Sequence, residues 1–214
     1  MTTPMAEFMN HTSEQPGPEQ IRRGRRMAVL LFTVGLGPMV VATLMYYTGW
    51  LNPSGHTNHG VLITPPLPVA ELQLTDATGA PLEDHFGSAV AEPRWLMIVV
   101  ADRCADACES LLYLSRQVNI ALGKNAHRVA RSAYLQVVPA AFQRHWQENY
   151  PLMQRLTSGA AEHPRWPEGV DPRQTPRVLL VDPLGNVMMH YGTEHSGKAI
   201  LEDLKHLLKL SQIG

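Results

Sequence analysis

Residues 95–114 read WLMIVVADRCADACESLLYL, and this stretch decides the fold. Its first six residues are apolar, which is typical of a strand that is covered on both faces of a sheet. Its last four residues, LLYL, predict the buried face of a helix. The two cysteines of the chain, Cys104 and Cys108, therefore lie where a strand turns into a helix. Backbone N–H groups and the helix dipole at such a turn favour a thiolate, so the two cysteines are predicted to be the reactive residues of the chain.

The order of elements around this stretch predicts a thioredoxin-like α/β fold. A right-handed crossover makes the strand at residues 95–101 parallel to the next strand, at residues 129–138. The short turn PLGN at residues 183–186 makes the last two strands antiparallel. The expected result is a mixed sheet with helices on both faces. The other expected elements are a small hairpin at residues 71–80, helices at 107–122, from Pro139 to about 153 and at 198–210, a loop at 158–174, and strands at 177–182 and 187–191.

Residues 27–47, which contain no charged residue, predict one transmembrane helix. About 20 apolar residues are enough to cross the hydrocarbon core of a bilayer. Arginines precede this segment at positions 22, 23, 25 and 26, and no lysine or arginine follows it until Arg94. The positive-inside rule then places the N-terminus in the cytoplasm and the rest of the chain across the membrane. A cleaved signal peptide, a twin-arginine export signal and a buried helix of a soluble domain fit the length and the flanking sequence less well.

The composition divides the chain into four parts. Residues 1–26 read as a polar cytoplasmic tail, 27–47 as the transmembrane helix, 48–68 as a proline-rich tether, and 69–214 as the thioredoxin-like domain. The formal net charge of -1 argues against a nucleic-acid-binding protein, which would carry a concentrated basic face. With the domain outside the cytoplasm, the cysteine pair faces an oxidising compartment, in which disulfides persist.

The cysteine pair admits two chemistries and one purely structural interpretation. Two thiolates can bind Cu(I), a soft ion. The same two sulfurs can instead alternate between a dithiol and a disulfide. Without chemistry, they would be two small buried residues. The spacing does not separate these options, and the candidates for a third metal ligand are His127, His163, His190 and His195.

Four features of the sequence occur together in one known family. They are the anchor with its tether, the C-x-x-x-C pattern at Cys104 and Cys108, the sequence VDPLGN at residues 181–186, and the amphipathic C-terminal helix. Together they resemble the Sco/SenC family of cytochrome c oxidase assembly proteins. The resemblance implies a single-pass protein of the bacterial inner membrane with a periplasmic domain. It also implies that oxidase subunits or other assembly factors are the partners, and that the cysteines deliver Cu(I) or keep the oxidase's copper-binding cysteines reduced.

One residue departs from the pattern of that family. Sco proteins bind copper with the two cysteines and with a histidine nine residues before the proline of the DP-x-G turn. Here that proline is Pro183, and Gln174 stands at the histidine's position. The next two residues, Thr175 and Pro176, resemble the cis-proline beside the active cysteines of thioredoxins, so Pro176 is expected to shape the groove. Copper binding, thiol chemistry for the oxidase, general thiol–disulfide exchange and a non-catalytic scaffold with a structural disulfide all stay open on the sequence.

Overall fold

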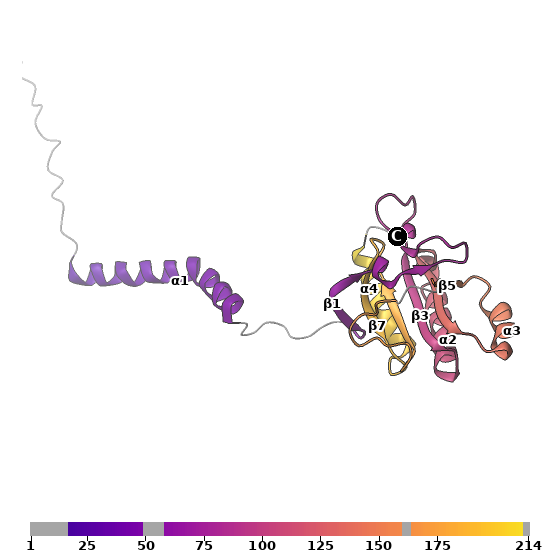
Figure 1. Ribbon diagram of the computed structural model, residues 1–214. Coiled ribbons are helices and arrows are strands. Elements are labelled where there is room, and N and C mark those ends of the chain that lie inside the picture. Colours follow the sequence, from indigo (N-terminus) through magenta and orange to yellow (C-terminus); the bar gives the residue numbers. More distant parts are fainter. Residues whose placement is uncertain (1–16, 49–57, 160–163, 212–214) are drawn as a thin grey trace, which may run out of the picture. The chain divides into compact units, whose positions relative to one another are not determined.

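The computed structural model describes residues 17–48, 58–159 and 164–211, and the chain divides into two compact units, residues 1–55 and 56–214. The first unit contains helix α1 (Pro18–Thr48). The second contains all the other helices and strands (Figure 1).

Helix α1 is long and apolar enough to cross a membrane, in agreement with the prediction for residues 27–47. It has 31 residues and begins at Pro18, so it also takes in residues 18–26, which the composition assigns to the tail. Proline is favoured at the start of a helix because its missing N–H would have no partner there. The hydroxyls of Thr33 and Thr43 each donate to the carbonyl four residues earlier at 2.8 Å. These bonds satisfy polar groups that lipid could not satisfy.

The second unit is built on a seven-stranded mixed sheet with the strand order β1-β7-β6-β3-β4-β5-β2. The central strand β3 is parallel to β4 and antiparallel to β6, and β6 is antiparallel to β7. The predicted crossover and the predicted antiparallel pair are therefore both confirmed. The strands are β1 (Val61–Pro68), β2 (Leu74–Thr75), β3 (Trp95–Arg103), β4 (Val129–Val137), β5 (Gln154–Ser158), β6 (Arg177–Val181) and β7 (Asn186–Tyr191). The helices are α2 (Asp106–Ala121), α3 (Ala140–Asn149) and α4 (Gly197–Leu210), with 3-10 helices η1 (Val69–Leu72), η2 (Leu82–His85) and η3 (Gly123–Arg128).

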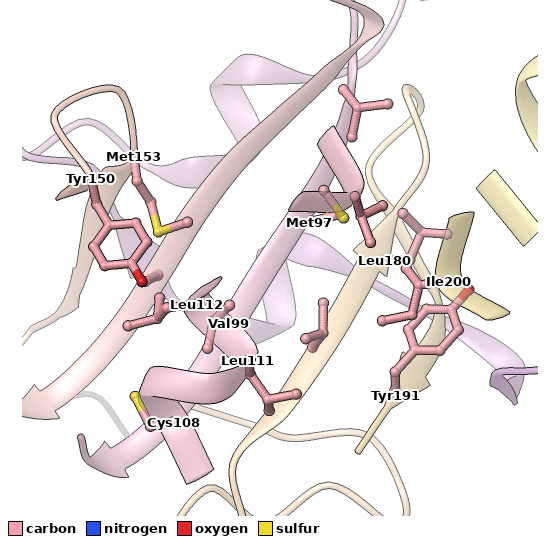
Figure 2. Close-up of a cluster of buried hydrophobic side chains, with 14 of the residues drawn as sticks. Met97, Val99, Cys108, Leu111, Leu112, Tyr150, Met153, Leu180, Tyr191 and Ile200 are labelled. Carbon is pink, nitrogen blue, oxygen red and sulfur yellow. The ribbon is translucent and has the colours of Figure 1, made fainter. Parts of the chain in front are cut away.

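The two faces of β3 build two separate cores, because residues 95–101 of this strand are all apolar and buried. Met97 and Val99 belong to the core that α2, α3 and α4 cover (Figure 2). Ile98 and Val100 belong to the core on the other face of the sheet, which η1, η2 and residues 166–170 cover. The helices on this second face are therefore short 3-10 helices.

The predicted tether is too long, because its last eight residues form the edge strand β1. β1 pairs with β7 in antiparallel register, with Val61 opposite His190 and Leu67 opposite Val187. Its three prolines are tolerated because an edge strand needs a hydrogen-bonding partner on one side only, and the register shifts between Leu62 and Leu67. The folded domain therefore begins before the predicted boundary at residue 69.

Two further elements differ from the prediction. Helix α3 ends at Asn149, and strand β5 follows at residues 154–158, where the sequence predicts the end of a helix and the start of a loop. The predicted hairpin at residues 71–80 is reduced to the two residues of β2 and one bridge to Pro81. Both differences concern short segments in which few residues are buried.

One carboxylate holds the turn that follows β2. Asp76 accepts hydrogen bonds from the Thr78 hydroxyl at 2.6 Å, the Thr78 N–H at 2.8 Å and the Ala80 N–H at 3.1 Å. The His85 ring lies 3.1 Å from the other carboxylate oxygen. These bonds, chiefly the one from the Thr78 hydroxyl, lower the pKa of Asp76 to about 2.

The Asp76→Asn substitution is expected to make the domain's stability less sensitive to acid. The pKa of Asp76 falls from 3.8 to about 2 on folding. The carboxylate therefore contributes stability that is present above about pH 4 and is lost as the pH falls toward 2. Urea unfolding of the full chain in detergent between pH 7 and pH 3 measures this effect. Asp84→Asn, a change at an exposed carboxylate nearby, is the control, and equal pH dependence in wild type and Asp76→Asn would contradict the expectation.

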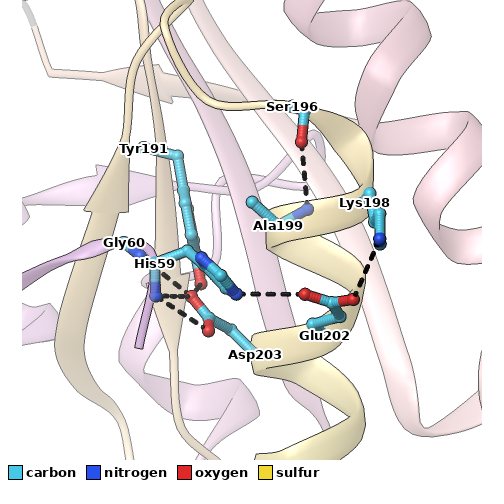
Figure 3. A network of polar contacts seen from close by, with 8 residues as sticks. All are labelled: His59, Gly60, Tyr191, Ser196, Lys198, Ala199, Glu202 and Asp203. Atoms are coloured by element: carbon cyan, nitrogen blue, oxygen red, sulfur yellow. Dashed lines mark hydrogen bonds and ion pairs between the residues drawn. The ribbon is translucent and has the colours of Figure 1, made fainter. Parts of the chain in front are cut away.

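A second, buried carboxylate fastens the start of the domain to the last helix. Asp203 on α4 is 4% exposed. It accepts hydrogen bonds from the N–H groups of His59 and Gly60 at 2.9 to 3.0 Å and from the Tyr191 hydroxyl at 3.1 Å (Figure 3). Gly60 packs so closely that a Cβ there would lie 2.7 Å from Met189 Sδ and would clash with the Tyr191 ring. Burial, together with the charge of Asp203, raises the pKa of Tyr191, so its hydroxyl stays protonated and donates. We call Asp203, His59, Gly60 and Tyr191 the Asp203 latch.

Candidate functional site

The two cysteines lie at the carboxyl end of the central strand, as the sequence predicts. β3 ends at Arg103 and α2 begins at Asp106, so Cys104 precedes the helix and Cys108 lies in its first turn. The N–H of Cys104 donates to the carbonyl of Val137 at 3.2 Å, which ties the turn to the end of β4. No side chain caps the start of α2, so no capping oxygen competes for the N–H groups of its first turn.

Cys104 and Cys108 are joined by a disulfide, and their Cα atoms are 5.1 Å apart. Both residues are buried, with 2% and 1% of their surface exposed, and both belong to the core that the α-helices cover. Figure 2 shows Cys108 on α2, in the same core as Leu111 and Tyr150. A disulfide carries no thiolate, so this state can accept electrons but cannot bind Cu(I) until it is reduced.

A second segment reaches the same end of the sheet. The N–H of Asp102 donates to the carbonyl of Pro172 at 2.9 Å. From Arg177 onward the chain pairs with β3 as strand β6. Gln174 and Pro176, which lie between these two points, are therefore brought beside the end of β3, from which the chain continues to the first cysteine.

The bond before Pro176 is trans, so the predicted cis-proline is wrong. Among the described residues the one cis peptide bond is Thr64–Pro65, in β1. The chain approaches Pro176 through a turn in which the Asp171 carbonyl accepts the N–H groups of Gln174 and Thr175. Because this turn already directs the chain into β6, no cis bond is needed there.

The described part of the chain brings no third metal ligand to the cysteines. Gln174 is exposed, and its amide donates to the Asp171 carboxylate at 2.8 Å. No group of three histidine, cysteine, aspartate or glutamate side chains that could hold a metal occurs among these residues. If the pair binds Cu(I), the described residues offer it two sulfurs.

The candidate histidines lie elsewhere. His127 is exposed in η3, before the start of β4, and so lies at the opposite end of the sheet from the cysteines. His190 is buried on the other face of the sheet, where burial and then the charge of Arg177 lower its pKa and keep its ring neutral. His195 accepts a hydrogen bond from the backbone at 3.0 Å, and His163 lies outside the described residues.

Two charged residues with structural roles, Asp203 and Arg177, belong to none of the sequence motifs described above. Asp203 lies within the apolar stripe of α4, between Ile200 and Leu204, and a charge at a buried position is a signal that could have been used. Arg177 opens an apolar strand and pairs with Glu194 at 2.8 Å. The partner is 17 residues away, so no local pattern announces this pair.

Comparison with solved structures finds Sco proteins of several organisms. The chain is similar to yeast Sco1, with 16% identity and a TM-score of 0.49 over 75% of this chain and 100% of that one. It is similar to apo Sco1 from Thermus thermophilus, with 17% identity and a TM-score of 0.47 over 72% and 99% of the two chains. It is also similar to copper-bound ScoI from Arabidopsis thaliana, with 14% identity and a TM-score of 0.46 over 68% and 98%. A search of curated protein sequences found no significant match.

Family models match both units of the chain. The model described as the transmembrane-like, N-terminal domain matches residues 18–49, which contain α1. The model described as the transmembrane-like, thioredoxin-like, C-terminal domain matches residues 95–211, more than half of the chain, from β3 through α4. The matched region includes the disulfide and strands β3 to β7 of the mixed sheet. The chain therefore belongs to the family of transmembrane-like, thioredoxin-like proteins.

Proposed function

We propose that this chain is a membrane-anchored thiol–disulfide protein that assists the assembly of cytochrome c oxidase. The disulfide between Cys104 and Cys108 at the start of α2 carries the proposal, because such a bond can accept and release two electrons. Membership of a thioredoxin-like family with a membrane-type N-terminal segment supports it. The Sco-like features of the sequence support the oxidase as target. The arginines at residues 22–26 support a bacterial inner-membrane anchor with the domain in the periplasm.

The dithiol form does the chemical work in this proposal. A thiolate of Cys104 or Cys108 attacks a disulfide between the oxidase's copper-binding cysteines, and one oxidase sulfur leaves as a thiolate. The other cysteine attacks the mixed disulfide, releases the second oxidase thiolate and closes the Cys104–Cys108 bond. The oxidase site gains two electrons and the chain loses two. A dithiol reductant then returns the chain to its reduced form by the same exchange.

The surroundings of the pair suit such an exchange. The uncapped start of α2 stabilises a thiolate. Burial of both sulfurs means that a partner must open the core locally before it reacts, which protects the dithiol from small oxidants. Pro176 lies beside the end of β3 and shapes the groove for the partner's chain. Gln174 stands where Sco proteins have a histidine, so that position supplies no metal ligand.

Delivery of Cu(I) is a second candidate function, because it uses the same two sulfurs. Once reduced, Cys104 and Cys108 offer two thiolates within one turn, a donor set that suits Cu(I). The ion would be cargo, taken up by the dithiol form and passed to the oxidase. The two functions compete for one reduced state, so the redox behaviour of the pair decides between them.

The reduction potential of the full chain in detergent tests the proposal. Equilibration with dithiothreitol or glutathione, followed by trapping of free thiols, should give a potential above about −270 mV, in the range of exchanging pairs. A value below about −300 mV would mark a structural disulfide and overturn the proposal. Gln117→Ala, exposed on the same helix, is the matched control and should leave the potential unchanged.

Titration of the reduced chain with Cu(I) tests the second candidate. Wild type should take up one ion that the Cys104→Ser, Cys108→Ser variant does not take up, and identical uptake would remove the delivery function. Rapid turnover of unrelated protein disulfides would favour a general oxidoreductase. If the double variant still co-purifies with the oxidase, and the disulfide of the wild type is inert, a scaffold function would be favoured.

A further inference from the structure

One helix begins directly beside the buried disulfide. The carbonyl of Val137, at the end of β4, accepts the N–H of Cys104 at 3.2 Å. Helix α3 starts at Ala140, so only residues 138–139 separate it from this contact. Phe142, in the first turn of α3, is 5% exposed and belongs to the same core as both cysteines. The first turn of α3 is therefore placed close to the sulfurs.

In the described part of the chain, α3 is attached to the rest of the domain by apolar packing. The hydrogen bonds of residues 140–149 in this part are all made within residues 139–150. The ion pairs found there do not involve α3. Phe142 and Trp146 pack against the core, with their ring centroids 6.4 Å apart, whereas residues 143–145 between them are exposed.

The other two α-helices of the domain are each tied to a distant segment by polar contacts. On α2, the Asn119 amide donates to the carbonyl of Val129 in β4 at 2.9 Å. On α4, Asp203 accepts the N–H of Gly60 at 2.9 Å. Segments with few buried contacts are the ones that open at a low cost in free energy. Since α3 has no such tie among the described residues and lies at the outer margin of the domain (Figure 1), it is the α-helix that opens most easily.

We propose that α3 is a lid over the Cys104–Cys108 disulfide and that Phe142 keeps the lid closed. The helix swings out about the short links at residues 138–139 and 150–153, and a partner's thiolate then reaches the bond. This inference rests on the function proposed above, because a lid matters only for a disulfide that reacts. A partner that binds the domain can displace α3, whereas a small thiol must wait for the lid to open. The lid therefore makes the exchange selective for binding partners.

The rate at which dithiothreitol reduces the disulfide of the full chain in detergent tests the lid. A buried bond reacts only in open molecules, so the rate follows the open fraction. Phe142→Ala should raise the rate at least about tenfold, because it removes a buried ring that holds α3. Phe142→Leu should fall between this variant and wild type. Gln143→Ala, at an exposed position in the same turn, is the matched control and should react like wild type.

Two measurements separate the opening of the lid from unfolding of the whole domain. Leu204→Ala truncates a side chain of the same core on α4 and should not raise the rate. The wild-type rate should depend on urea much more weakly than global unfolding does, because the opening of one helix exposes little surface. The lid is overturned if folded Phe142→Ala reacts like wild type, if Leu204→Ala accelerates reduction as much, or if the urea dependence equals that of global unfolding. If Phe142→Ala does not fold, Phe142→Leu and the urea dependence decide.

The lid and the proposed function can fail separately. The reduction potential is an equilibrium quantity and tests whether the bond exchanges, whereas the ratio of rates tests what covers it. A potential in the range of structural disulfides would overturn the function and leave the ratio of rates in place. Equal rates for wild type and Phe142→Ala, with a potential in the exchanging range, would overturn the lid and leave the function in place.

Discussion

Cells in which this chain carries both Cys104→Ser and Cys108→Ser are expected to lose cytochrome c oxidase activity to the level of a strain without the chain. In the proposed cycle these residues provide both the attacking thiolate and the resolving one, and serine replaces neither at neutral pH. Oxygen uptake with an oxidase-specific electron donor measures the loss. The copper content of the purified oxidase shows whether the copper site is affected.

Two rescue experiments separate the two chemistries. If the chain reduces the oxidase's cysteines, a small dithiol added to the medium should restore activity and added copper should not. If it delivers Cu(I), excess copper should restore activity and the dithiol should not. Gln117→Ala serves as the control for expression and anchoring. Full activity in the double serine variant, with normal amounts of the chain, would exclude both chemistries and leave the scaffold function.

Replacing Asp203 with alanine is expected to lower the free energy of unfolding of the domain by about 3 to 5 kcal/mol. The substitution removes the acceptor for the N–H groups of His59 and Gly60 and for the Tyr191 hydroxyl. The Gly60 N–H and the Tyr191 hydroxyl would stay buried without this acceptor, and the start of β1 would lose its attachment to α4. Urea unfolding of the full chain in detergent, followed by tryptophan fluorescence, measures the change.

The neighbouring residue on the same helix provides the control. Glu202 lies 3.0 Å from the His59 ring and 3.8 Å from Lys198, but its side chain is 48% exposed. Glu202→Ala is therefore expected to cost less than about 1 kcal/mol, as is usual for exposed ion pairs. Asp203→Asn, which keeps one acceptor oxygen, should fall between the two. A loss of less than about 1 kcal/mol for Asp203→Ala would show that the latch does not stabilise the domain.

Elements with a strong apolar pattern could be predicted from the sequence. β3 shows an unbroken apolar run, and α4 shows a helical stripe, because both bury their side chains against elements distant in the chain. β1 was missed because its three prolines are typical of a tether, although an edge strand tolerates them. β5 was missed because Leu156 is its only fully buried residue, which leaves no alternation to detect.

The position of the cysteine pair in the fold could be predicted from the sequence, but its disulfide bond and its burial could not. The apolar run before Cys104 and the helix after Cys108 were enough to place the pair at a turn. Whether the sulfurs are bonded and how deeply they are buried depends on packing that no local pattern reports. The predicted cis bond before Pro176 rested on a likeness to thioredoxins, whereas a local turn, in which the Asp171 carbonyl accepts the N–H groups of Gln174 and Thr175, leads into β6 with a trans bond.

The position of the Asp203 latch also determines how the domain responds to mechanical force. A load transmitted from the membrane anchor enters the domain at its first described residues, which include His59 and Gly60. Strand β1 is held along one edge, so a pull at its start would peel its bonds from β7 one after another rather than break them together. The hydrogen bonds that His59 and Gly60 donate to Asp203 would be the first to break. They would set the tension at which the start of the domain begins to open.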